Sequence, residues 1–271
     1  MHHFLTNLDP DLRNALMIQL RNLWTHTSTA IEGNTLTLGE TAFVLEEGLT
    51  IAGKPLKDHE EVVGHARAID LIYDLVKEGR ELGETDLFAL HKAVQADVIV
   101  DVYKPVGGWK VEPNSTVGVI DEKQAIFEYA PPADVPGLMA KWFDLHRKLN
   151  HSITPGDDRK ALDAYVRLHI GFVRIHPFFD GNGRLARLVA NIPVLKAGLP
   201  PIIIPRERRK AYIDALSAYH FAVGQIHSGD ELLPEPEKME PLETFCRQAW
   251  QTSLDLVDEV RRKQRARQER T

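Results

Sequence analysis

The chain has 271 residues, of which 43% are hydrophobic and 27% are charged. This composition is typical of a globular protein with a core and excludes a disordered or collagen-like chain. No apolar run approaches the ~20 residues of a membrane-spanning helix, and the first residues lack a signal-peptide pattern, so we expect a cytoplasmic protein. The single cysteine, Cys246, excludes an internal disulfide and a cysteine-based zinc site.

The net charge of −6 is distributed unevenly along the chain. The segment from Arg261 to Thr271 carries a net charge of +5, so the rest of the chain carries −11. An acidic body argues against a nucleic-acid-binding protein. We interpret the basic end as a solvated last turn of a helix, where cations are favourable.

Apolar residues at helical spacing predict a mostly helical fold. Asp9 and Pro10 indicate the start of a first helix, and Thr37 with Glu40 has the pattern of a capping box for a second. A third helix is predicted from Asp58 to about Gly79, and a fourth is predicted to open at Thr85. Further helices are predicted at about 134–149, 158–175, 182–197, 206–226 and 241–266.

One stretch departs from the helical pattern. β-Branched and aromatic residues between Ser115 and Tyr129 flank the polar run from Asp121 to Gln124, which predicts a short hairpin. An isolated hairpin is marginally stable unless it packs on something. The predicted fold class is therefore all-α with one small β-hairpin.

A segment rich in chemistry joins two predicted helices, with the sequence HPFFDGNGRLAR from His176 to Arg187. Its proline ends the preceding helix, its two glycines permit unusual backbone conformations, and the next helix must start near Asn182. The first N–H groups of that helix have no intrahelical partner. Together with Arg184 and Arg187 on one helix face, they form a site suited to phosphate oxygens.

Two further side chains in this segment suit nucleotide chemistry. His176 carries an imidazole that can remove a proton near neutral pH. Asp180 would be repelled by phosphate alone, but it fits as a ligand of a Mg²⁺ ion that bridges phosphates. The segment therefore indicates phosphoryl or nucleotidyl transfer.

The same twelve residues match every specified position of H-x-F-x-[DE]-G-N-G-R-x-x-R, so the sequence resembles the Fic family. The resemblance implies an all-helical fold around a target-binding flap, here the hairpin at about 111–130. It also implies transfer of AMP from ATP to a hydroxyl of a protein target, with release of pyrophosphate. Auto-AMPylation is expected as well.

The resemblance assigns a role to each matching residue. His176 would deprotonate the target hydroxyl, Asp180 would hold magnesium, and Phe178 would anchor the loop. The phosphate cradle would be formed by Gly181, Asn182 and Gly183, the outer phosphates would be held by Arg184 and Arg187, and Asn191 matches a position that contacts adenine in some relatives.

A second family motif, [ST]-x-x-x-E-[GN], is matched from Ser28 to Gly33. In relatives with an N-terminal inhibitory helix, the glutamate pairs with the second arginine of the signature. The resemblance therefore implies that Glu32 binds Arg187, in a bidentate pair, and denies it to the γ-phosphate. The alternative is that Glu32 and Gly33 merely end a helix.

Several alternatives remain at this stage. Glu32 can instead position a water for de-AMPylation, the donor can be another nucleotide or phosphate compound, or the site can be a non-catalytic nucleotide sensor. The segment from Gly107 to Lys110 departs from the G-x-[YF]-R of many relatives. We divide the chain into an N-terminal helical region (1–55), a catalytic core (56–226) and a C-terminal helical extension (227–271). The expected partners are ATP and a protein target, and a homodimer is left open.

Overall fold

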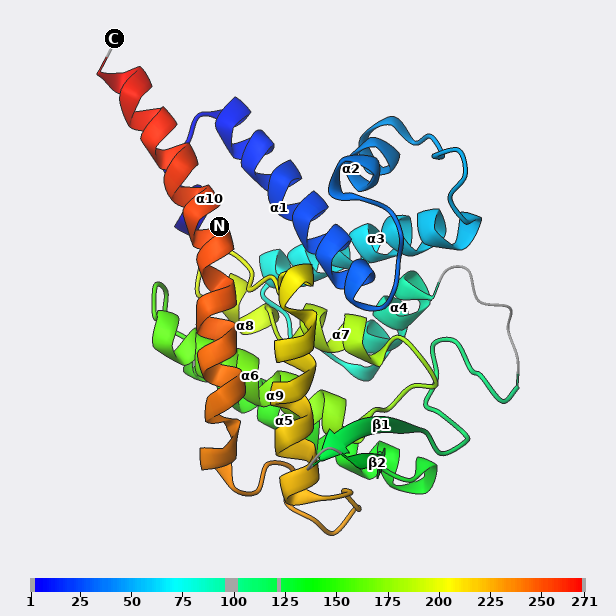
Figure 1. The fold of residues 1–271 in the computed structure, drawn as a ribbon. Helices are drawn as coiled ribbons and strands as arrows, with labels where there is room; N and C mark the ends of the chain where they lie inside the picture. The colour runs from blue at the N-terminus through cyan, green and yellow to red at the C-terminus, as the bar shows by residue number, and fades with distance from the viewer. Residues whose placement is uncertain (1–2, 96–101, 121–122, 270–271) are drawn as a thin grey trace.

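A computed structural model describes residues 3–95, 102–120 and 123–269. Within them, the fold is all-α with a single two-stranded antiparallel sheet, as predicted (Figure 1). The turn of the predicted hairpin, residues 121–122, and the last two residues of the basic end lie outside the described residues. No described helix is long and apolar enough to cross a membrane.

The helices and strands follow one another in the order shown in Figure 1. The α-helices are α1 (Pro10–Ile31), α2 (Leu38–Glu47), α3 (Leu56–Glu78), α4 (Glu84–Val94), α5 (Val135–Ser152), α6 (Asp158–Ile175), α7 (Asn182–Val189), α8 (Ile192–Lys196), α9 (Arg209–Val223) and α10 (Glu240–Gln268), and the hairpin strands are β1 (Ser115–Ile120) and β2 (Lys123–Glu128).

Helix α6 lies at the centre of the fold and positions the site. It packs against α5, α7, α8 and α10, and nearly all of its last two turns is buried. Trp142 of α5 is fully buried, and its indole N–H donates to the carbonyl of Leu168 at 2.9 Å. A helix enclosed on several sides holds its C-terminal end in place, and that end is His176.

The predicted helix starts have mixed outcomes. The capping box of α2 is confirmed, because Thr37 and Glu40 each accept a hydrogen bond from the other's backbone N–H, at 3.2 and 2.8 Å. Asp9 precedes α1 as predicted, but its carboxylate does not cap the helix. It lies 3.2 Å from Arg267 of α10 instead, so it joins the start of the first helix to the end of the last.

The helix predicted over 182–197 is wrong as a single element, because the structure divides it into α7 and α8. Pro193 lies in the first turn of α8, where its missing N–H costs no hydrogen bond. The break falls at Ala190 and Asn191, between the end of α7 and the start of α8.

The buried histidines predict an acid-sensitive fold. Burial lowers the pKa to about 4 for His91 and His146, and to about 3 for His169, His176 and His220. Below pH 6.5 the unfolded chain takes up protons that the folded chain excludes, so the free energy of unfolding decreases as pH falls toward 4. The loss is roughly 1 kcal/mol per histidine for the first pH unit.

Urea denaturation at pH 7.5 and 5.5 tests this expectation, because most carboxylates stay ionised in both states over this range. The midpoint should fall at pH 5.5, and His146→Gln should reduce the difference between the two midpoints. Equal midpoints for the unmodified chain would contradict it.

Candidate active site

His176 occupies the end of α6 in a left-handed backbone conformation, with φ of 53°. Its Nδ1 atom lies 3.3 Å from the carbonyl oxygen of Val173. Because a carbonyl only accepts hydrogen bonds, this contact places the proton on Nδ1 and leaves a lone pair on Nε2. The ring of Tyr129, just after β2, stacks on the imidazole with 3.7 Å between centroids.

The imidazole of His176 is neutral at physiological pH. Burial, together with the nearby charge of Lys110, lowers its pKa to about 3. Lys110 is itself only 2% exposed, and burial lowers its pKa to about 7. His176 is therefore held in the form that accepts a proton.

The loop after His176 is fixed by hydrogen bonds to its backbone. Asn182 accepts from the N–H of Phe178 at 2.9 Å and donates to its carbonyl at 2.8 Å. Asn114 donates to the same carbonyl at 3.0 Å, and the N–H of Lys110 donates to Pro177 at 2.9 Å. The side chain of Asn182 thus shapes the loop, and its backbone N–H lies at the start of α7.

The start of α7 has the geometry expected of an anion site. Gly181 precedes the helix with φ of +77°, and the first helical hydrogen bond runs from Leu185 to Gly181 at 3.0 Å. The N–H groups between these two residues have no intrahelical partner. They point toward the end of the helix where the dipole favours negative charge.

Arg184 and Asp180 lie side by side at this cradle. Arg184 is 4% exposed, and it donates to the carbonyl of Val94 at 2.9 Å and lies 3.4 Å from Asp180. Burial raises the pKa of Asp180, but the charge of Arg184 and the N–H of Gly181 outweigh burial, so the pKa is lowered overall. The Asp180 side chain is 64% exposed and stays ionised, which leaves it accessible to a cation.

The residues present fit magnesium only together with a nucleotide. The described part of the chain has no group of three or more His, Cys, Asp or Glu side chains that could hold a metal. Mg²⁺ commonly binds through one or two carboxylates, with substrate phosphates and waters completing its shell. One ionised carboxylate beside a phosphate cradle matches that donor set.

Arg187 is 2% exposed, and its hydrogen bonds join α7 to α1. Its Nη2 donates to Glu32 Oε1 at 2.7 Å and to the carbonyl of Ser28 at 2.8 Å, while Nε donates to the Ser28 hydroxyl at 3.0 Å. Glu32 contacts the guanidinium through one oxygen rather than through the bidentate pair expected from the motif. Ser28 makes the remaining contacts to α1.

The end of α1 also agrees with the simpler interpretation of the motif. The helix ends at Ile31, Glu32 is its C-cap, and Gly33 has φ of +107°. The same turn that ends the helix therefore aims Glu32 at Arg187. A Cβ atom on Gly183 would lie 2.5 Å from Glu32 Oε1, so the carboxylate also lies directly against the cradle.

Two residues of α9 had no signal in the sequence. Arg209 donates to the carbonyl of Ile31 at 2.6 Å, and the Tyr212 hydroxyl lies 3.5 Å from Arg187. Tyr212 also lies 2.8 Å from Nε2 of His169. These contacts link residues far apart in the chain, so no local sequence pattern predicts them.

Asn191 is fully buried, and its side-chain amide bonds to backbone groups. Its amide donates to the carbonyls of Arg187 and Ile202, at 2.9 and 3.0 Å, and accepts from the N–H of Ile202 at 2.7 Å. Both ends of the amide bond to the backbone in this structure, and the contact of Asn191 with adenine stays a prediction. Its role is to hold the chain after α8 against the end of α7.

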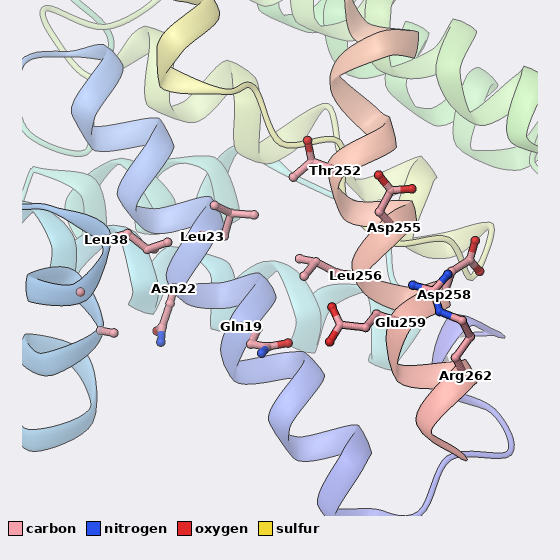
Figure 2. A pocket seen from close by; sticks show the side chains of 12 residues that line it. Gln19, Asn22, Leu23, Leu38, Thr252, Asp255, Leu256, Asp258, Glu259 and Arg262 are labelled. Carbon is pink, nitrogen blue, oxygen red and sulfur yellow. The ribbon is translucent and has the colours of Figure 1, made fainter. Parts of the chain in front are cut away.

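A large cavity lies elsewhere, between α1, α2 and α10. It has a volume of about 910 Å³, and none of its lining residues belongs to the signature segment. Figure 2 shows Leu23 and Leu38 on one side and Thr252, Asp255 and Leu256 of α10 on the other. The chemistry of the side chains, and not cavity size, therefore locates the candidate active site.

Comparison with known proteins matches residues 81–193 to the Fic/DOC family. Over 196 residues the chain is 33% identical to "Protein adenylyltransferase fic-1" of Caenorhabditis briggsae, and over 197 residues it is 32% identical to "Protein adenylyltransferase Fic" of Drosophila willistoni. Each match covers 72% of this chain but only 36% and 34% of the relative. The chain thus spans about a third of the length of these relatives.

A solved structure is similar over almost its whole length. The Fic domain-containing signaling protein of Bacteroides thetaiotaomicron is 26% identical, with a TM-score of 0.78. The similarity covers 94% of this chain and 93% of that one. The likeness therefore includes the helices on both sides of the matched family region.

The geometry of Asn191 yields a test of its structural role. Asn191→Ala should lower the free energy of unfolding by roughly 1–3 kcal/mol, because it leaves buried backbone groups of Ile202 without partners. The folded variant should bind ATP within about twofold of the unmodified chain. Urea denaturation measures the stability and titration calorimetry measures ATP binding. Unchanged stability with weakened ATP binding would contradict the structural role and support a contact between Asn191 and adenine.

Proposed function

Because the chain carries a Fic domain, we propose that it is a magnesium-dependent protein adenylyltransferase restrained by its own first helix. Its reaction would transfer AMP from ATP to a Ser, Thr or Tyr hydroxyl and release pyrophosphate. The observation that carries this proposal is the free Nε2 of His176 beside a cradle with Asp180 and Arg184. Base, metal ligand and phosphate site occur together.

The proton and the phosphate have separate places in this site. His176 Nε2 takes the proton of the target hydroxyl as the oxygen attacks the α-phosphorus, and the bond to pyrophosphate breaks. The N–H groups at the start of α7 and Arg184 hold the phosphate oxygens. When bound, Mg²⁺ supplies positive charge between the phosphates, with Asp180 as its protein ligand.

The resting contacts support autoinhibition. Arg187 is the second arginine on this face of α7, and Glu32 and Ser28 already occupy its donors. A γ-phosphate can reach the guanidinium only if Glu32 withdraws. The N-terminal region 1–55 thus regulates the core 56–226, and ATP binding competes with the contact between α1 and α7.

De-AMPylation by the same site is the second candidate. The Glu32 side chain is 38% exposed, so water reaches the carboxylate next to the cradle. A carboxylate in this place can accept a proton from a water that attacks the AMP-modified residue. The two activities make opposite demands on Glu32. This residue restrains AMP transfer, whereas de-AMPylation requires it.

The hairpin supports a role in binding the protein target. Val117 and Ile126 are cross-strand partners, with exposed fractions of 63% and 70%. Tyr129 follows β2 and stacks on His176, so the hairpin leads directly to the base. An extended target segment beside the hairpin would bring its hydroxyl to Nε2.

The proposal predicts that Glu32→Gly releases AMP transfer. With α-labelled ATP, magnesium, and lysate or the protein itself as acceptor, labelling should rise about 10- to 100-fold. This is the size expected from removing a charge-assisted hydrogen bond worth about 1.5–3 kcal/mol. Adding His176→Ala should abolish labelling, and Glu47→Gly at the exposed end of α2 serves as the matched control.

Other outcomes distinguish the alternatives. Release of AMP from a modified protein by the unmodified chain, and its loss in Glu32→Gly, would identify de-AMPylation. Labelling from UTP or GTP but not from ATP would change the donor. Nucleotide binding without any transfer in Glu32→Gly would favour a sensor and contradict the proposed enzyme.

Magnesium dependence is a further expected outcome. Excess EDTA should abolish the labelling by Glu32→Gly, because the phosphates then lack a cation beside Asp180. Asp180→Asn keeps the size of the side chain and removes its charge, so it should raise the magnesium concentration that gives half-maximal labelling. Full activity in EDTA would contradict the role of Asp180.

A further inference from the structure

His91 of α4 lies directly behind the loop that carries Asp180. It is 1% exposed, and its ring stacks on the ring of Phe178 with 3.9 Å between centroids and 17° between planes. Neither the signature nor the inhibitory motif contains this residue. A buried histidine packed on the anchor of the signature loop is placed to control the loop's shape.

Its two backbone partners fix the position of the proton on the ring. The N–H of Gly107 donates to Nδ1 at 2.8 Å, so Nδ1 carries no proton. Nε2 lies 3.1 Å from the carbonyl oxygen of Asp180, which only accepts. The ring is therefore the neutral tautomer with its proton on Nε2, and that proton is donated to Asp180.

The hydrogen bond from His91 sets the orientation of one peptide plane. The Asp180 carbonyl and the Gly181 N–H belong to the same planar trans peptide, so they point in opposite directions. The Gly181 N–H in turn helps to lower the pKa of the Asp180 carboxyl. Holding the Asp180 carbonyl through His91 therefore also sets the direction of the Gly181 N–H.

The loop needs an external support at this point. Gly181 has φ of +77° and no side chain to restrict rotation, and the Asp180 side chain is 64% exposed. The hydrogen bonds of Asn182 and Asn114 fix Phe178, which is two residues earlier. Among the described residues, His91 is the one whose side chain makes a hydrogen bond to the backbone of Asp180.

We propose that His91 is a positioning residue that orients the Asp180–Gly181 peptide so that the Asp180 carboxylate is held ready for the magnesium of a bound nucleotide. The inference rests on the proposed function only in that Asp180 faces a magnesium–nucleotide complex. Outer partners of this kind typically alter metal affinity by about 10- to 100-fold when they are removed. His91 itself touches neither nucleotide nor target.

Two substitutions separate the hydrogen bond from the packing. His91→Phe keeps an aromatic ring over Phe178 and removes both nitrogen atoms. His91→Gln keeps an amide that can donate to Asp180. Both are made in a chain with Glu32→Gly and His176→Ala, so that ATP binds without the inhibitory carboxylate and without turnover.

Titration calorimetry of ATP, with magnesium and with EDTA, measures how much the metal tightens nucleotide binding. His91→Phe should reduce this magnesium-dependent gain by about tenfold or more, and affinity in EDTA should change by less than about twofold. His91→Gln should retain most of the gain. Equal losses in EDTA and magnesium, or an equal loss in both variants, would overturn the proposal.

A spectroscopic measurement tests the tautomer in the chain without substitutions at His91. Long-range ¹H–¹⁵N spectra of histidine-labelled protein at pH 7 should show His91 with its proton on Nε2, identified by the signal lost in His91→Gln. A proton on Nδ1 would overturn the proposal even if His91→Phe fails to fold. Neither measurement needs AMP transfer, so failure of the enzyme assay and failure of this inference are separate results.

Discussion

The buried guanidinium of Arg187 is the interaction on which the rest of the site depends. It is 2% exposed, and a charge removed from water is tolerated only with partners of good geometry. Its partners come from α1 and α9, so the N-terminal helix, the signature helix and a helix from the later part of the chain meet at one group. Any anion that replaces Glu32 must satisfy the same donors. In the proposed function, the group that binds the nucleotide is thereby also the group that keeps the N-terminal helix in place.

The signature segment does not determine its own shape. Hydrogen bonds from Lys110, Asn114 and His91 reach the backbone of the loop from segments 60 or more positions earlier. Pro177 and the glycines make the loop possible, because they end one helix and permit the turn into the next. The distant side chains then select one conformation among those that remain. A match to the signature without these supports would have the right residues in a loop of undefined form.

The sequence predicts what depends on local pattern and misses what depends on distance. Periodicity located the helices, and spacing brought His176, Asp180, Arg184 and Arg187 together. The break between α7 and α8 was missed because apolar periodicity continues through Pro193. The backbone contacts of the Asn182 and Asn191 side chains were not predicted, because an amide bonds equally well to ligand and backbone and residue type does not distinguish the two uses. Tyr212 and His91 act through partners far along the chain, where sequence spacing carries no information.

The stacking of Tyr129 on His176 joins the end of the hairpin to the base. Aromatic stacking tolerates little change in ring separation, so a shift of the hairpin at this point is also a shift of the imidazole's neighbour. In the proposed reaction, a target that binds along the hairpin would therefore affect the geometry of proton transfer as well as its own affinity. Two targets held equally tightly would be modified at different rates if they set the hairpin differently. Discrimination between targets would then reside in the chemical step, where binding measurements do not detect it.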